Sequence, residues 1–246
     1  MAYFLNTIDA GKTREVEKWR KAPKEVRREI NRAARLNPTT EAQAKVNRNR
    51  ALRKLICLVN ANFGFGDFWL TFTYAREYMP TDESCDKDYK KLMAKLRALY
   101  KKAGVPFKYI AVYGQPGHRP HIHLLCSKGV DLEEIAALWE CGRVGIKLLD
   151  NRGQYRGLAE YIFKHGKDRD GKSWFSSRNL IHPKEKVKEI NAKRWRDEPT
   201  APKGFMIDKT SPIEQGVNPI TGAEYLRYTL IRLPQKAKTN SKAVFK

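Results

Sequence analysis

The hydrophobic and polar positions between residues 68 and 150 follow a strand-like pattern in four places. The segment FWLTFTY at 68–74 is rich in β-branched and aromatic residues and predicts a strand. The segments at 107–114 and 120–126 have the same character. Because only a short loop with glycine and proline joins them, they are expected to form a hairpin. A fourth strand is expected at 143–150.

Three further segments have the spacing of amphipathic helices. Between residues 84 and 104, apolar side chains recur every three or four positions, and Gly104 is expected to end the helix. Either Ser84 or Asp86 is expected to cap its N-terminus. Shorter helices, each with a glycine at its end, are expected at 131–142 and 153–166.

These elements predict an α+β fold, in which a central antiparallel sheet carries helices packed on it. The strand at 120–126 is part of that sheet and contains a His-x-His pattern. The expected organisation along the chain has three parts. They are a basic helical N-terminal arm at 1–59, a central domain at 60–170 and a C-terminal extension at 171–246.

The segments outside the central domain have weaker patterns. Residues 12–54 are dense in Lys, Arg and Ala and predict one or two exposed helices, broken near the Asn37-Pro38 pair. After residue 170 the chain becomes loop-rich. A short helix is expected after Pro183, and strands are expected at 204–208 and 223–233.

The net charge points to a polyanionic partner. The chain has 49 Lys and Arg against 27 Asp and Glu, a formal net charge of +22. Nucleic acid is the partner that such an excess favours. Residues 12–54 alone contain 15 basic and 5 acidic residues. Two interpretations of this stretch stay open: it lies along DNA phosphates, or it is a solvated helical face.

The remaining composition indicates a cytoplasmic protein. No pair among the four cysteines has CxxC spacing, so a zinc knuckle is poorly supported and reduced thiols are expected. The N-terminus lacks a basic region followed by an apolar one, so no signal peptide is expected. The longest apolar runs are too short to cross a bilayer, and no membrane partner is expected. The cysteines are Cys57, Cys85, Cys126 and Cys141.

The histidines of the pattern at 121–123 are the first candidates for chemistry. Residues two apart on a strand point to the same face, so His121 and His123 form half of a metal site, whereas Ile122 points into a core. A His-x-His pattern is weak evidence by itself, because two polar residues on a solvated face give the same pattern.

A tyrosine on the helix at 153–166 is the candidate nucleophile. Tyr161 precedes Lys164 by three residues, so the two share a helix face. A phenol is a poor nucleophile until a cation favours its phenolate, and an ammonium group or a metal ion does so. Tyr155 is the rival, although Leu158 occupies the equivalent position after it. His165 is a possible proton acceptor, but a plain helix-end residue is the favoured interpretation.

Together these motifs resemble the HUH endonucleases, and among them the rolling-circle replication initiators of phages and plasmids. The match consists of FWLTFT at 68–73, HIH at 121–123 and YIFK at 161–164, in the order that the family has them. The motifs span less than half of the chain. Because the tyrosine follows the histidines, the order differs from that of conjugative relaxases.

The resemblance implies a mechanism and a ligand set. His121 and His123 would bind Mg²⁺ or Mn²⁺, and Tyr161 would attack an origin phosphate to leave a 5′-phosphotyrosine and a free 3′-OH. Lys164 would orient or neutralise charge. The usual third ligand is acidic or polar, and Gln115 stands at its position with His118 as a second choice. A neutral amide oxygen is a weaker ligand for a hard cation than a carboxylate.

The implied function is a replication initiator with nicking and joining activity, a nucleotidyltransferase that acts on single-stranded or supercoiled origin DNA. Host helicase and polymerase are the expected partners, in the cytoplasm of a bacterial host. A single-tyrosine HUH transposase and a non-catalytic DNA-binding replication regulator are the alternatives. The residues expected to touch DNA are Lys54, Arg119 and Arg178, the last within the segment WFSSRNL.

Overall fold

The computed structural model describes residues 2–20, 41–78, 80–114, 120–166, 174–192 and 194–234. The chain divides into two compact units. The central unit runs from residue 39 to 184 and includes residues 9–11. The terminal unit is formed by residues from both ends of the chain. The sequence-based expectation placed those ends in separate segments.

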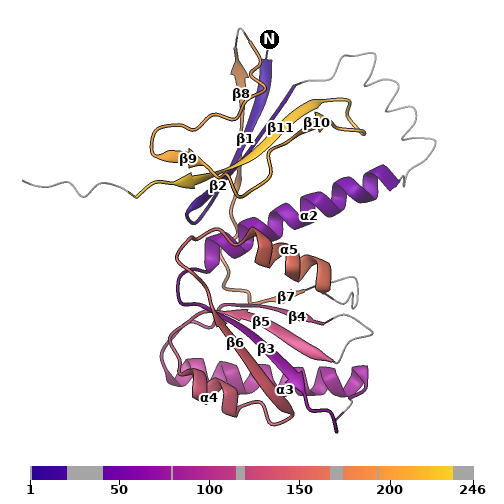
Figure 1. Ribbon diagram of the computed structural model, residues 1–246, viewed down its shortest axis with the longest axis vertical. Helices are drawn as coiled ribbons and strands as arrows, with labels where there is room; N and C mark the ends of the chain where they lie inside the picture. Colours follow the sequence, from indigo (N-terminus) through magenta and orange to yellow (C-terminus); the bar gives the residue numbers. More distant parts are fainter. Residues whose placement is uncertain are drawn as a thin grey trace, which may run out of the picture. The chain divides into compact units, whose positions relative to one another are not determined.

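A five-stranded antiparallel sheet forms the centre of the central unit (Figure 1). All neighbouring strands are antiparallel, and the expected hairpin is confirmed as the pair β4 and β5. Four of the strands confirm the sequence prediction, and the fifth is a short edge strand within WFSSRNL. In sheet order they are β6 (Gly142–Leu148), β3 (Phe68–Tyr74), β5 (His121–Cys126), β4 (Tyr109–Tyr113) and β7 (Phe175–Ser176).

Helices cover both faces of this sheet (Figure 1). Alternation along β3 sends Phe68, Leu70 and Phe72 into one core and Trp69 into the other. The first core includes α3 (Asp82–Lys102) and α4 (Leu132–Ala137). The second includes α2 (Glu41–Asn62) and α5 (Arg156–His165), which pack against each other.

The ends of α3 show which local signals held. Thr81 caps the N-terminus, because its hydroxyl accepts a hydrogen bond from the backbone N–H of Ser84 at 3.3 Å. The expectation that Ser84 or Asp86 would be the cap is therefore wrong by three or more residues. Gly104 ends the helix region as expected, with φ of 69° in the left-handed conformation that favours glycine.

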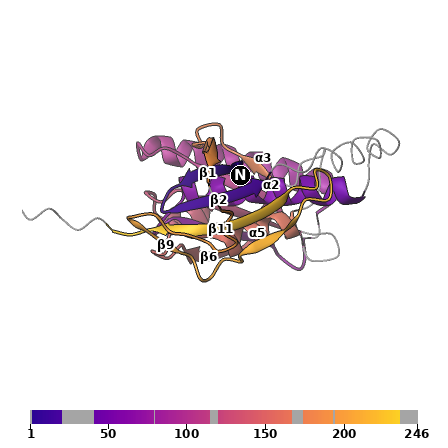
Figure 2. The ribbon, with the colours of Figure 1, turned by 90° about the horizontal axis from the view of Figure 1, so that it is seen from above.

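The terminal unit contains a second antiparallel sheet (Figures 1 and 2). Its strands come from both ends of the chain, and β9 pairs with β11 beside the main path. A small core of Val16, Leu226, Tyr228 and Leu230 belongs to this unit. In sheet order the strands are β10 (Glu214–Val217), β11 (Glu224–Arg232), β2 (Thr13–Arg20), β1 (Ala2–Ala10) and β8 (Glu185–Asn191), with β9 (Phe205–Ile207).

Two of the helices expected in the flanking segments are strands. Thr13–Arg20 was expected to be helical, but it pairs with β11 over almost its whole length. Its polar residues hid the alternation, because Glu15 and Lys18 are buried among partners of the second sheet. The short helix expected after Pro183 is also wrong, because Glu185–Asn191 pairs with β1. Of the expected helical arm, only the part within α2 is confirmed among the described residues.

Other expectations for the terminal unit are confirmed. Strands expected at 204–208 and 223–233 are β9 and β11. The overall α+β class with an antiparallel sheet that carries the His-x-His strand is confirmed as well. Within the described ranges, no helix combines the length and the apolar character needed to span a membrane.

Candidate functional site

The two histidines lie side by side on one face of the central sheet. His121 and His123 are on β5, with ring centroids 4.6 Å apart, and Ile122 between them is buried in the core of the opposite face. On the neighbouring strand β3, Thr73 is paired with His121 and Thr71 with His123. The alternation predicted from the sequence therefore places two imidazoles and two hydroxyls on the same face.

His123 lies between two hydroxyl groups. Its Nδ1 is 3.0 Å from the hydroxyl of Thr71, and its Nε2 is 3.0 Å from the hydroxyl of Tyr161. A neutral imidazole has one N–H, so it donates one of these hydrogen bonds and accepts the other. Both ring nitrogens are thus held, which fixes the orientation of the ring.

Trp69 supports the same imidazole from the sheet. Its ring is stacked on His123, with centroids 5.0 Å apart and planes 13° from parallel. The edge-on ring of Tyr161 lies 6.0 Å from Trp69. His123 is only 5% exposed as a result. The aromatic residue of FWLTFT is thus a floor of the site, a role that the sequence analysis missed, although its alternation with Thr71 is the signal that places it on this face.

Burial controls the charge of His123. It lowers the pKa of this imidazole to about 4, and the nearby His121 and His165 act in the same direction. At neutral pH the ring is therefore uncharged. Neutral imidazole is the form that binds a metal ion or accepts a hydrogen bond.

Tyr161 reaches the histidines because of how α5 packs on the sheet. Ala159 and Ile162 are fully buried under the helix, whereas Tyr161 is 38% exposed at the edge of that stripe. Its hydroxyl is turned to His123, and the rest of its ring remains open to a partner. This is the arrangement expected of a residue that must contact both the sheet and a ligand.

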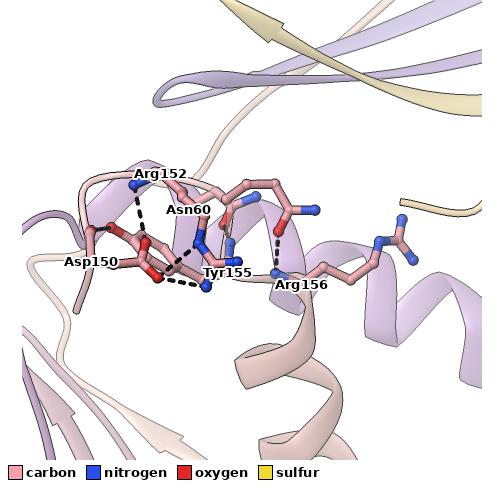
Figure 3. Close-up of polar contacts among 6 residues, drawn as sticks. Asn60, Asp150, Arg152, Tyr155 and Arg156 are labelled. Atoms are coloured by element: carbon pink, nitrogen blue, oxygen red, sulfur yellow. Dashed lines mark hydrogen bonds and ion pairs between the residues drawn. The ribbon is translucent and has the colours of Figure 1, made fainter. Parts of the chain in front are cut away.

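The rival tyrosine has a structural role instead. Tyr155 is 6% exposed and precedes the first turn of α5. Its hydroxyl donates to the backbone oxygen of Asp150 at 2.7 Å, and its backbone N–H donates to Oδ1 of Asn60 on α2 at 2.8 Å (Figure 3). Tyr155 therefore anchors the start of α5, and its hydroxyl does not face the histidines.

The end of α5 presents His165 to the candidate nucleophile. The rings of Tyr161 and His165 are stacked, with centroids 4.4 Å apart and planes 28° from parallel. In a stack the imidazole lies over the phenol ring, so the hydroxyl hydrogen bond goes to His123. Lys164 is exposed in the last turn of the same helix.

A glycine makes room for His121. At the end of β4, the N–H of Gly114 donates to the backbone oxygen of His121 at 2.9 Å. A side chain at position 114 would collide with the imidazole of His121. The sequence analysis did not single out this glycine, although its place directly after a strand and before the His-x-His strand is a usable signal.

The outer strand of the sheet adds two cations that the sequence analysis also missed. On β6, Arg143 is paired with Thr73 and Lys147 with Trp69, so both lie on the face of the histidines. Both are exposed. Gly145 between them is paired with Thr71. The alternation of RVGIK is the signal that would have placed them.

The remaining predicted site residues divide into two groups. Gln115, His118 and Arg119 lie outside the described residues. Lys54 is exposed on α2 and Arg178 is exposed after β7. Neither has a described contact with the histidines. Among the residues that the structure describes, no group of three His, Cys, Asp or Glu side chains forms a candidate metal cluster.

One comparison with known proteins gives a match. A family model for replication-associated proteins of the ORF2 type matches residues 67–166, which is less than half of the chain. The matched region runs from the start of β3 to the end of α5 and contains both histidines, Trp69, Thr71 and Tyr161. It links this region to replication-associated proteins and so to DNA. No curated protein and no solved structure matches the chain.

Proposed function

We propose that the chain is a replication initiator that nicks and rejoins single-stranded origin DNA through a 5′-phosphotyrosine intermediate. The observation that carries the proposal is the 3.0 Å contact between the hydroxyl of Tyr161 and Nε2 of His123, beside His121. The matched family of replication-associated proteins supports the same role. The resemblance to HUH endonucleases supplies the chemistry.

In the proposed nicking step, Tyr161 is the nucleophile. Its oxygen forms a bond to the phosphorus while the bond from phosphorus to the 3′ oxygen breaks. The phenol loses a proton, and the departing oxygen gains one and becomes a free 3′-OH. One phosphate ester replaces another, so the step needs no ATP. Attack by a 3′-OH on the phosphotyrosine reverses the step and joins the strand.

The histidines fit the proposed role as ligands of Mg²⁺ or Mn²⁺. A hydrogen on Nδ1 of His123 can be donated to Thr71, which leaves the lone pair of Nε2 for a ligand bond. The low pKa of this imidazole keeps it neutral. When bound, the ion would neutralise charge on the phosphate. Gln115 is the proposed third ligand.

Tyr161 occupies the same nitrogen that this role requires. Its hydroxyl must therefore leave Nε2 before His123 acts as a ligand, and the exposed side of the ring leaves room for that movement. The stack with His165 would guide the phenol, because it holds the ring plane while the hydroxyl changes partner. Lys164 is proposed to neutralise charge on the DNA beside it.

The decisive experiment looks for a covalent adduct. The protein is incubated with Mn²⁺ and single-stranded oligonucleotides that tile the origin of its own genetic element, and the products are separated under denaturing conditions. Tyr161→Phe is expected to abolish the adduct. Tyr155→Phe is the matched control, because it removes a hydroxyl that bonds only to the backbone of Asp150 among the described contacts.

Each outcome has a defined meaning. An adduct that persists in Tyr161→Phe overturns the choice of nucleophile. No adduct from the wild-type chain with any origin oligonucleotide overturns the enzymatic function and favours a DNA-binding replication regulator. Excision of a DNA element, in place of the joining of a nicked circle, favours a transposase. In the proposed role, host helicase and polymerase would extend the 3′-OH in the bacterial cytoplasm.

A further inference from the structure

The sheet of the terminal unit separates basic from acidic side chains by face. Residues directly opposite each other on paired strands share a face, as do residues two apart on one strand. On β2 and β11, Arg14 is paired with Leu230 and Lys18 with Leu226. Arg232 is paired with Phe205 of β9. These three cations therefore share the face that carries the small core of this unit.

Two exposed lysines of β8 lie on the same face. Phe4 and Trp19 are stacked with centroids 5.4 Å apart, and Trp19 is paired with Tyr225 on the face opposite to Arg14. The even-numbered residues of β1 therefore belong to that opposite face. Lys186 and Lys188 are paired with Thr7 and Leu5, which are odd-numbered and lie on the basic face.

We call this surface the basic face, defined by Arg14, Lys18, Arg20, Lys186, Lys188 and Arg232. Within the described strands, its acidic side chains are Glu224, which forms an ion pair with Arg20 at 3.2 Å, and Asp9 at the end of β1. The opposite face carries most of the carboxylates of the sheet. They are Glu15, Glu17, Glu185, Glu189 and Glu214.

Aromatic rings hold several of these cations in place. The guanidinium groups of Arg14 and Arg232 both lie over the ring of Phe205, at 4.3 and 5.0 Å. Arg20 lies 4.9 Å above Trp195, and Lys18 lies 5.5 Å above Tyr228. Such contacts fix the long side chains of arginine and lysine at little further entropic cost when they bind an anion.

We propose that the basic face is a second DNA-binding surface, which holds the sugar–phosphate backbone of duplex DNA. Its chemistry is that of backbone contacts, because a row of cations with one sign attracts phosphate without reading bases. Proteins that bind single strands without sequence preference add open aromatic rings on which bases stack. Here the rings of Phe205, Trp195 and Tyr228 already have cations over them, so duplex DNA is the occupant that fits.

The inference goes beyond the proposed nicking activity and shares with it only the assumption that DNA is the partner. Cutting is assigned to the central unit. The terminal unit would hold the duplex that flanks the cut strand, so that the protein remains on DNA while the strand is open. Lys186 and Lys188 are the residues to test, because both are exposed and their strand lies at the edge of the sheet.

The test measures binding of the full chain, as the Tyr161→Phe variant, to a mixed-sequence duplex at several salt concentrations. The double variant Lys186→Ala and Lys188→Ala is expected to reduce the slope of log Kd against log salt by about 1.8, since each phosphate contact contributes about 0.9. The control is Lys90→Ala with Lys101→Ala. It removes the same charge from exposed positions of α3, on the other unit.

Each result decides between the alternatives. A slope that falls only in the Lys186/Lys188 variant supports the basic face, whereas equal slopes in both variants overturn it. A loss for a single-stranded oligonucleotide as large as the loss for the duplex overturns the assignment of duplex DNA. Covalent adduct formation on single-stranded origin DNA, measured with Tyr161 restored, is expected to persist in the Lys186/Lys188 variant. Failure of the nicking activity and failure of this surface are thereby distinguished.

Discussion

The hydroxyl of Tyr161 lies 3.0 Å from Nε2 of His123. One hydrogen bond therefore joins the proposed nucleophile to the proposed metal ligand, across a separation of 38 residues in the sequence. The contact makes the position of the phenol depend on the orientation of the imidazole. Changes that disturb the imidazole are therefore expected to affect cleavage even where they leave Tyr161 untouched.

Thr71 orients His123, so its loss is expected to weaken the metal site. Thr71→Val retains the shape of the side chain but removes the partner of Nδ1. Loss of such a partner typically lowers metal affinity by 10- to 100-fold. The Mn²⁺ concentration that gives half-maximal adduct formation is expected to rise by about that factor.

Thr73→Val is the matched control for this change. Thr73 is on the same strand and the same face, but no hydrogen bond from its side chain to either histidine is described. A metal requirement that rises equally in both valine variants would contradict a specific role of Thr71.

Gly114→Ala is expected to displace the imidazole of His121. The new Cβ would collide with that ring, whereas the backbone at this position does not require a positive φ. The variant should fold but lose most of its adduct formation, measured as the initial rate at saturating Mn²⁺. Gly157→Ala is the control, because nothing lies within 4 Å of its new Cβ. Since position 157 is within α5, this control is expected to be more stable by up to about 1 kcal/mol.

The buried His123 is expected to make the metal-free protein less stable in mild acid. Its pKa is lowered to about 4 in the folded state from 6.5. The stabilisation from the neutral ring is present above pH 6.5 and is lost as the pH falls toward 4, because only the unfolded chain takes up the proton in that range. The loss amounts to about 3 kcal/mol at most.

Two measurements check this pH dependence. NMR of the imidazole should show that His123 remains neutral at pH 5.5. The difference in free energy of unfolding between the wild type and His123→Gln should also change between pH 6.5 and 4, because glutamine does not titrate. A His123 titration near 6.5 in the folded protein would show that burial does not control its charge.

Arg143 and Lys147 are expected to bind the strand that enters the candidate active site. They lie on the face of the histidines at the exposed strand β6. Replacing both with alanine should lower the salt slope of single-strand binding by about 1.4, at about 0.7 per contact. The charge-matched Lys90→Ala and Lys101→Ala variant should leave this slope unchanged. A duplex-specific effect would place these two cations outside the path of the single strand.

Much of the central sheet follows from local patterns. The alternation in FWLTFTY predicts both the strand and the face on which Thr71 and Thr73 lie. The same rule places His121 and His123 together, and helical spacing places Tyr161 on α5. In each case the physical cause is a repeat of the backbone over a few residues, which a sequence records directly.

The terminal unit was predicted poorly because its partners are distant in the sequence. Glu15 and Lys18 look like residues of a solvated helix, yet both are buried on a strand. Glu15 accepts a hydrogen bond from the hydroxyl of Thr229 at 2.9 Å, across a separation of 214 residues. A buried polar residue with such a partner has no local hydrophobic signal.

The sequence by itself determined the order of strands and helices in the central unit and the faces of the His-x-His strand, because both depend on side-chain periodicity within single segments. Only the tertiary structure decided between Tyr161 and Tyr155, brought Thr71 and Trp69 onto His123 and joined the two ends of the chain in one sheet. Those relationships depend on strand register and on burial between distant segments. They are set by the free energy of the whole packed sheet, which no single segment encodes alone.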